Sequence, residues 1–332
     1  MGVKLTPIVL KKEIHLDDLR RKVLAVDGNA ELYQFLALIR KPDGTLLTDS
    51  HGHITSHLIG LTYRSTRLIS EYGIKLIFVF DGKPPSLKKE EIERRHETRE
   101  KFVKEYEEAK AAGDMETAFA KSVMTSRLTQ PMLEDAMHLL ELLGIPYVQA
   151  PGEGEAQAAF MARRGDAWGV GSKDYDSLLF GTPRLVRFVT ISGKEFLPSK
   201  GKFRPLKPEI IETREMLSHY QISLEQLIDL AILIGTDFNH GVKGIGPKTA
   251  LRLVQEYGRI ERLPPDVKSR VSKNYEDVRE IFYHPPTTED YMVEYGTLDE
   301  DGLYEFLCKE RDFSRERVEM VIRRMKTISE FL

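Results

Sequence analysis

Short apolar segments that each end on acidic residues constrain the fold of this chain more than any other feature. The segments have the composition of buried strands, and they cover residues 22–27, 75–80, 144–148 and 167–171. Stretches with helical periodicity separate them. Strands that alternate with helices predict an α/β fold, with an open, mostly parallel sheet flanked by helices.

Acidic residues follow each of these segments, at Asp27, Asp81, Glu153 with Glu155, and Asp174 with Asp176. In an open parallel sheet the carboxyl ends of the strands share one edge, where ligands bind. Asp237 follows an apolar helical segment, 224–234, and can reach the same edge. A single Asp at a strand end is more often a turn former or a helix cap. The hypothesis of a shared site therefore rests on four segments that end alike.

Seven carboxylates in one place repel one another and raise each other's pKa unless cations neutralise them. Oxygen ligands in this number suit Mg²⁺ or Mn²⁺ rather than zinc. Two such ions would generate a hydroxide nucleophile and stabilise both oxygens of a phosphodiester displacement. The pattern therefore indicates a metal-dependent reaction on a phosphodiester.

Composition bounds the class of protein. Of 332 residues, 41% are hydrophobic and 30% are charged, which is enough apolar material for a core and excludes a disordered chain. The single cysteine, Cys308, excludes an intramolecular disulfide framework and a zinc site of several cysteines. No apolar stretch approaches the length of a transmembrane helix. We therefore expect no membrane association and a reducing, cytoplasmic location.

The net charge of −3 argues weakly against a nucleic-acid partner. Net charge misleads, however, if many acids are gathered in one site. Setting the seven aside leaves 45 of the 52 acids against 49 Lys and Arg. The objection to a nucleic-acid partner then disappears.

Two further segments suggest binding elements. Residues 88–127 contain ten basic and ten acidic residues but few apolar ones, which predicts a helical arm or lid. A glycine-rich turn joins the helices expected at 224–234 and 248–257. It can bring backbone N–H groups to a phosphate, although a plain helix–helix turn is the alternative. The residues expected to contact the DNA backbone there are Lys243, Gly244, Gly246, Lys248 and Thr249.

A β-hairpin is expected from 184–191 and 194–197, around the turn Ser192-Gly193. From residue 207 onward the chain is mostly helical, interrupted at 282–299.

Several motifs, taken in this order, resemble those of the structure-specific 5′ nuclease family, most closely its archaeal–eukaryotic flap endonuclease branch. They cover nearly the whole chain: Ala25-Val-Asp27 with Tyr33-Gln-Phe-Leu36, Thr55-Ser-His-Leu58, Val79-Phe-Asp-Gly-Lys-Pro-Pro85, Glu153-Gly-Glu155-Ala156, Asp174-Tyr-Asp176, and Ile234-Gly-Thr-Asp237 through Gly244-Ile-Gly-Pro247.

The resemblance implies a PIN-like nuclease core, a helical arch over the active site, and a helix-hairpin-helix element that can hold a monovalent cation (K⁺). It implies cleavage of 5′ flaps at the junction with duplex DNA, with 5′ exonuclease activity, in lagging-strand maturation and repair. The resemblance divides the chain into a nuclease core, residues 1–86 and 131–332, and an arch, residues 87–130. The DNA-binding element lies within the core, at about 220–262.

The resemblance also assigns roles to residues. The seven acids would hold two Mg²⁺, for which Mn²⁺ can substitute. Lys88 and Arg95 would contact the scissile phosphate and stabilise the charge that develops in the transition state. Tyr33 and Arg40 would pack against the template base where the DNA bends. Thr55 and Ser56 would form part of a pocket for a one-nucleotide 3′ flap.

Two positions depart from the family pattern. Gly28 follows Asp27 where Ala, Thr or Val is commoner, which affects local backbone freedom. The last eight residues, from Met325 to Leu332, have the spacing of a sliding-clamp peptide but Met in place of its first Gln. This segment is either a degenerate or a truncated clamp motif. Branched DNA is the expected partner, and a sliding clamp is a second partner if this segment binds it. A monomer is expected, cytoplasmic in an archaeal-type source or nuclear in a eukaryote.

Other functions share some of these sequence features. The segment Val26-Asp27-Gly28-Asn29 suggests a haloacid-dehalogenase-like phosphatase, but the second Asp that this chemistry needs is missing. A DNA-junction binder with a decayed site conflicts with acids at all seven positions. A gap endonuclease or a general 5′ exonuclease stays open, since flap preference depends on arch and pocket geometry.

Overall fold

A seven-stranded sheet forms the centre of the protein. The computed structural model describes residues 2–190, 193–197 and 202–329. The strand order is β1-β9-β6-β5-β2-β3-β4. The neighbouring strands from β6 to β4 pair in parallel, and β9 and β1 complete one side with antiparallel pairings. The bounds are β1 (Lys12–Glu13), β2 (Val23–Asp27), β3 (Lys75–Phe80), β4 (Tyr147–Gln149), β5 (Gly169–Gly171), β6 (Arg184–Arg187) and β9 (Glu209–Glu212). The predicted α/β fold with a mostly parallel sheet is confirmed.

The order of the strands creates a switch point beside β2. From β2 the chain adds β3 and β4 on one side, and β5 and β6 follow on the other. Connections that leave in opposite directions open a crevice at the carboxyl ends of the strands. This crevice is the edge where the sequence places its acids.

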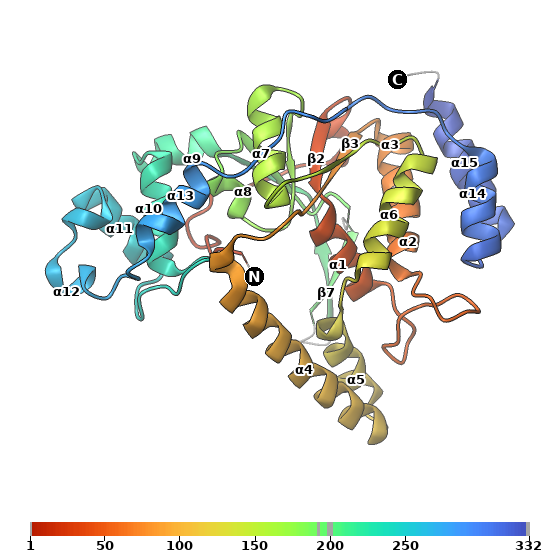
Figure 1. Ribbon diagram of the computed structural model, residues 1–332, viewed down its shortest axis with the longest axis horizontal. Coiled ribbons are helices and arrows are strands. Elements are labelled where there is room, and N and C mark those ends of the chain that lie inside the picture. The colour runs from red at the N-terminus through yellow and green to blue at the C-terminus, as the bar shows by residue number, and fades with distance from the viewer. Residues whose placement is uncertain (1, 191–192, 198–201, 330–332) are drawn as a thin grey trace.

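Alternation along the strands builds a core on each face of the sheet. Leu24 and Val26 point into one core and Ala25 into the other, as the two-residue period of a strand requires. Figure 1 shows helices on both sides. The first face is covered by α1 (Gly28–Leu38), α2 (Ser56–Gly60), α3 (Thr66–Tyr72), α6 (Gln130–Leu142), α14 (Glu300–Leu303) and α15 (Arg315–Ser329). The second is covered by α7 (Gly154–Arg164), α8 (Asp176–Leu179), α10 (Leu224–Ile234), α11 (Pro247–Tyr257) and α13 (Tyr275–Tyr283).

A pair of helices stands away from this body. In Figure 1, α4 (Lys89–Ala111) and α5 (Met115–Ser122) extend downward side by side. Within α4, which the structure describes throughout, Glu91 and Ala109 are the only buried residues. Lys121 of α5 bonds Glu105 of α4 at 2.5 Å and joins the two helices. We call these two helices the arch.

The last turns of α4 and the end of α5 rest on the loop that follows α1. Lys110 Nζ lies 3.3 Å from Asp43 Oδ2, and the Tyr106 hydroxyl donates to the Asp43 carbonyl at 3.3 Å. Gly44 has a φ of 82°, and a Cβ there would lie 2.7 Å from the Ser122 hydroxyl oxygen. Glycine is therefore required at this position both by the backbone conformation and by the approach of the arch.

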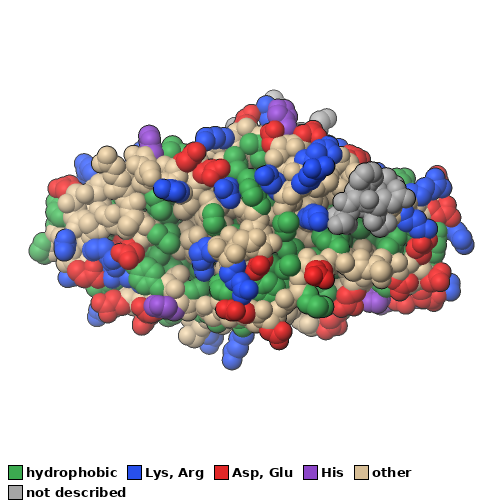
Figure 2. All heavy atoms as spheres, turned by 90° about the horizontal axis from the view of Figure 1, so that it is seen from above, with side chains coloured by type: hydrophobic (Ala, Val, Ile, Leu, Met, Phe, Trp, Pro, Cys, Tyr) green, Lys and Arg blue, Asp and Glu red, His purple; other side chains and the backbone are tan. Residues whose placement is uncertain are grey.

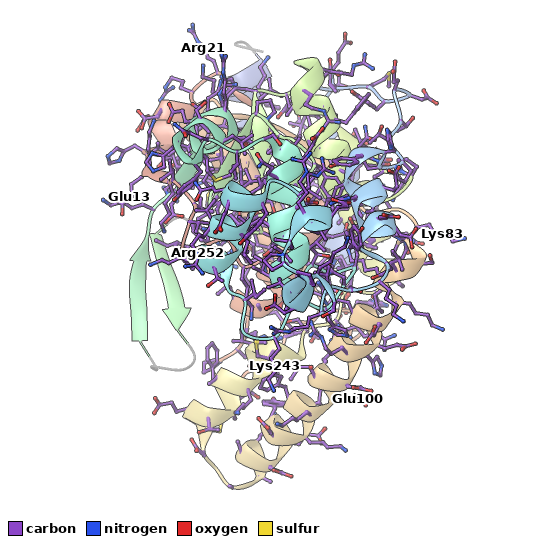
Figure 3. All side chains as sticks on the ribbon, turned by 90° about the vertical axis from the view of Figure 1, so that its left-hand side faces the viewer. Glu13, Arg21, Lys83, Glu100, Lys243 and Arg252 are labelled. Carbon is purple, nitrogen blue, oxygen red and sulfur yellow. The ribbon has the colours of Figure 1, made fainter. Side chains whose placement is uncertain are left out.

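The prediction of a β-hairpin from 184–191 and 194–197 is wrong. Instead β6 pairs with β5 and β9 inside the main sheet, where Leu185 and Val186 are buried. The hairpin forms one segment later, between β7 (Gly193–Leu197) and β8 (Lys202–Leu206). The apolar pair of β6 gains more from burial in the sheet than from an exposed two-stranded hairpin. Figure 3 shows that the β7–β8 hairpin and the arch project from the same side of the body.

A buried ion-pair network joins α10 to α13 and to the segment after α11. Two further helices of this region are α9 (Thr213–Tyr220) and α12 (Pro265–Lys268). Asp229 is fully buried and accepts hydrogen bonds from Arg279 at 2.6 and 2.8 Å, from Arg259 at 3.1 Å, and from the Ile260 amide at 3.1 Å. Through these bonds α10, α13 and the segment after α11 are held together.

Within the described ranges, no helix is long and apolar enough to cross a membrane.

Replacing Asp229 with Ala should lower the free energy of unfolding by roughly 3–5 kcal/mol, because the buried Arg279 would lose its buried partner and keep only the more exposed Glu261. Urea unfolding followed by circular dichroism measures this. As a control, Glu225→Gln removes an exposed partner of Arg259 and should cost less than about 1 kcal/mol. Equal losses in both variants would show that the network adds nothing beyond a surface pair.

Candidate active site

The structure brings the seven acids together at the switch point. Asp27 ends β2, where its carboxylate accepts the Ala30 amide at 2.9 Å and caps α1. Asp81 follows β3, Glu153 and Glu155 lie at the start of α7, and Asp174 and Asp176 follow β5. Asp237 lies in the turn after α10, which the Thr236–Asn239 bridge closes.

The charges of these acids act on one another. The pKa of Asp27 is raised well above its usual range by burial, and then by Asp81 and Asp174. Burial also raises the pKa of Glu155, with contributions from Asp176 and Asp27. Burial, followed by Asp237, raises the pKa of Asp176 to about 7. The carboxylates crowded at the strand ends therefore have raised pKa values, and the site favours the binding of either protons or cations.

Two cations from the base of the arch meet this site. Lys88 Nζ donates to Glu153 and lies 3.9 Å from Asp237 Oδ2. Arg95 donates to Asp237 Oδ2 at 2.5 Å and to Glu91 at 2.9 Å. Burial raises the pKa of Glu153, and the charge of Lys88 opposes that effect. The residues expected near a scissile phosphate are thus bonded to two of the carboxylates.

The carboxylates do not form a closed metal-binding cage. Among the described residues, no three of the types His, Cys, Asp and Glu lie close enough to hold a metal ion as they stand. The donor set still fits hard divalent cations, since it consists of oxygens whose buried members, including Asp27, disfavour an uncompensated charge.

Several residues that sequence reasoning missed orient these acids. The Val3 amide donates to Asp176 Oδ1 at 2.6 Å, and the Ser172 hydroxyl donates to Glu155 at 3.1 Å. Asn29 accepts the Asp81 amide at 3.0 Å. Ser172 could have been found from its place beside Asp174, whereas nothing in the sequence links Val3 to a residue more than 170 positions away.

Gly28 has a packing role beyond the backbone freedom expected of it. A Cβ at this position would lie 2.6 Å from the Phe80 ring, which is fully buried at the end of β3. Glycine after Asp27 therefore makes room for a large aromatic under the site.

Tyr33 and Arg40 lie on and just after α1, and Tyr33 is half-buried. Arg40 donates to the Leu36 carbonyl at 2.9 Å, to the Gly44 carbonyl at 2.7 Å, and to the Ser126 hydroxyl at 2.8 Å. Its guanidinium joins α1, the loop after it and the returning end of the arch. A contact with DNA would require Arg40 to exchange some of these bonds.

Thr55 and Ser56 are buried at the start of α2, with 4% and 0% of their surface exposed. The Ser56 hydroxyl accepts the Leu47 amide at 2.9 Å. In this conformation both residues support the loop before α2 rather than line an open surface.

The glycine-rich turn presents an open backbone. A Cβ at Gly244 or Gly246 would meet nothing within 4 Å. Lys243 and Lys248 are exposed beside them, with Thr249 half-buried in the first turn of α11. In Figure 3, Lys243 lies on the side of α10 and α11 that faces the arch.

Part of the segment expected to form a clamp peptide, residues 330–332, lies outside the described residues. Met325, which stands where the peptide would have its Gln, is 6% exposed and packs into the core beside α3. A peptide that starts at Met325 would have to leave this core.

The fold and site define a class of nuclease. The XPG N-terminal domain model matches residues 1–102, and the XPG I-region model matches residues 144–237. The second match ends on Asp237, so the two matches contain all seven acids. The catalytic core of Rad2 bound to a DNA substrate has the same fold, with a TM-score of 0.71 at 22% identity over 97% of both chains.

Closer relatives narrow this class. The flap endonuclease 1 of Hyperthermus butylicus is 50% identical over 98% of this chain and 94% of that protein, and that of Pyrococcus abyssi is 49% identical over the same shares. The structure of the flap endonuclease-1 of Methanococcus jannaschii matches with a TM-score of 0.77 and 40% identity, over 98% of both chains. The chain belongs to the flap endonuclease 1 family, as its motifs indicated.

A further acid, Glu31, is buried one turn after Asp27 on α1. Its carboxylate accepts a hydrogen bond from the Thr190 hydroxyl, and the charges of Lys173 and Arg64 are close by. Burial raises the pKa of Glu31 to about 7. Glu31 in turn raises the pKa of Asp27. The crowding of acids thus extends beyond the seven.

Glu31 should make stability depend on pH. A carboxyl whose pKa is higher in the folded than in the unfolded chain stabilises the fold at low pH, and this contribution is lost as pH rises from about 4.5 to about 7. Glu31→Gln should remove on the order of 2 kcal/mol of that loss. Urea unfolding at pH 5 and pH 8, without divalent ions, compares the variant with the wild type. An equal pH dependence would show that Glu31 ionises freely in the folded protein.

Proposed function

We propose that the chain cleaves 5′ single-stranded flaps where they join duplex DNA, with 5′ exonuclease activity, in lagging-strand maturation and repair. The observation that carries this proposal is the set of seven carboxylates at the switch point beneath an arch that contributes two cations. Family membership supports the activity, since the relatives are flap endonucleases. The reaction is the hydrolysis of a DNA phosphodiester bond.

Two Mg²⁺, or Mn²⁺ in their place, would be held by Asp27, Asp81, Glu153, Glu155, Asp174, Asp176 and Asp237. Bound there, they would supply a hydroxide nucleophile at neutral pH and stabilise the leaving oxygen. The protein orients the acids through fixed donors, with Ser172 on Glu155 and the Val3 amide on Asp176. Such fixed partners hold the carboxylates in place for the ions and for the scissile phosphate.

Lys88 and Arg95 would act on the scissile phosphate. Lys88 lies just before α4 and Arg95 in its second turn, both beside the carboxylates, so a flap that passes beneath the arch meets them next to the site. A positive charge within hydrogen-bond reach of the phosphate oxygens stabilises the charge that develops as the bond breaks. Their present bonds to Glu153 and Asp237 would be exchanged for the phosphate.

The duplex would contact the side of the protein from which the arch and the β7–β8 hairpin project. The Lys243–Thr249 turn offers open backbone amides and two lysines to one DNA strand, and its carbonyls could hold a K⁺ ion. Tyr33 and Arg40 would meet the template base at the bend, and Thr55 and Ser56 would border the 3′ flap pocket. On the face opposite the arch, acidic and basic side chains are intermixed and no field of one sign stands out (Figure 2).

Other partners and the location are part of the same proposal. The chain would act as a monomer in the cytoplasm of an archaeal-type cell. A sliding clamp would bind the last residues of the chain only if the end of α15 unwinds, because Met325 is buried. Branched DNA would be the main partner.

Cleavage of a labelled double-flap DNA in Mg²⁺ tests the activity. One product of flap length, abolished by EDTA, is expected, with much less product from single-stranded, blunt or nicked controls. Asp174→Ala should reduce the rate by about 10³-fold or more and spare most DNA binding, because it removes a metal ligand and not a phosphate anchor.

The control is Asp17→Ala, which removes an exposed acid outside the site and should leave the rate unchanged. Binding without cleavage by the wild type in either Mg²⁺ or Mn²⁺ would favour a junction-binding protein. Cleavage of gapped or plain duplex DNA as fast as flaps would favour a general 5′ exonuclease.

A further inference from the structure

The cations of the arch base and the divalent ions need the same carboxylates. Asp237 Oδ2 accepts from Arg95 at 2.5 Å and lies 3.9 Å from Lys88 Nζ, while Glu153 accepts directly from Lys88. An oxygen that binds a metal ion cannot keep a short hydrogen bond along the same direction. A divalent ion beside Lys88 and Arg95 would also face two positive charges at close range.

These ion pairs are shielded from solvent, so their competition with a metal ion is not screened away. The side chains of Lys88, Glu153 and Asp237 are 14%, 12% and 9% exposed. Charges in such surroundings interact several times more strongly than at the surface. The Arg95 side chain is 39% exposed, so its charge competes less strongly with a metal ion.

We propose that Lys88 and Arg95 antagonise metal binding, so that loading of the metal site releases the first turns of the arch. The inference rests on the proposed metal ligands. By linkage, the factor by which the ion pairs weaken metal binding equals the factor by which bound metal weakens the contact between the arch and the site. The two residues thereby become available to a phosphate only when the ions are in place.

The surroundings of the arch base allow such a movement. A cavity of about 190 Å³ lies between the first turns of α4 and residues 234–241. Glu90 is not one of the seven acids, and its carboxylate bonds His240 at 2.7 Å, which ties α4 to the turn after α10. This exposed contact can act as a pivot when Lys88 and Arg95 let go.

Mn²⁺ binding measured without DNA, by electron paramagnetic resonance of the free ion, tests the proposal. Arg95→Met and Lys88→Met should each tighten Mn²⁺ binding by about fivefold or more. The same variants should cleave flaps more slowly at saturating metal, because the cations also act on the phosphate. Tighter metal binding with slower chemistry is a combination that a merely structural role would not produce.

Two controls on the same helix separate the causes. Arg94→Met removes an equal charge that bonds Glu91 and not the metal set, so it reports the long-range effect of charge. Glu93→Gln removes an exposed acid of α4 that pairs with Lys89, and it should leave Mn²⁺ affinity unchanged. In the wild type, Mn²⁺ should increase hydrogen exchange in the first turns of α4, and in a Lys88→Met/Arg95→Met double variant it should not.

An unchanged or weaker Mn²⁺ affinity in both Arg95→Met and Lys88→Met would overturn the antagonism. So would an equal gain in Arg94→Met, which would reduce the effect to general electrostatics. These results differ from a failure of the proposed function, in which Mn²⁺ would not bind the wild type or Asp174→Ala would bind it as well as the wild type does.

Discussion

Carboxylates gathered at one edge of a parallel sheet repel one another, and the other charged groups of the site offset that repulsion. The sheet order makes the gathering unavoidable, because β2, β3, β4 and β5 all end in the same crevice. Burial removes the water that would solvate these charges, and the neighbouring acids add repulsion, so the pKa values of Asp27, Glu155 and Asp176 all rise. Two cations of the arch base relieve part of this cost, and divalent ions would relieve the remainder.

The same constraint connects the arch to the chemistry. At one end the arch is bonded to Glu153 and Asp237, and at the other it rests on the loop of Asp43 and Gly44. Arg40 links that loop to the returning chain at Ser126. The arch is thus positioned at both ends by residues beside the places where metal ions and the bent template are expected to bind. A change at either place can therefore reach the arch through a direct contact.

Sequence reasoning placed the strands and their acids because a strand of apolar residues and its terminal acid are local features. It placed Asp237 because an apolar helix led into it. It did not foresee that β6 joins the main sheet, since strand pairing is decided by burial among distant partners. Nor could it foresee the Val3 amide on Asp176 or the three bonds of Arg40, which join segments far apart in the chain. The roles of Lys88 and Arg95 came from family resemblance, because a charged helix shows no preferred partner.

Divalent ions should stabilise the folded protein only while the acids can ionise, and the urea unfolding midpoint at pH 8 tests this directly. The comparison is between the wild type and a Glu155→Gln/Asp176→Asn variant, each with and without Mg²⁺. The account predicts that Mg²⁺ raises the midpoint of the wild type and has little effect on the variant, which is itself more stable than the metal-free wild type because two buried charges are gone. A variant less stable than the metal-free wild type, or a wild type indifferent to Mg²⁺, would contradict it.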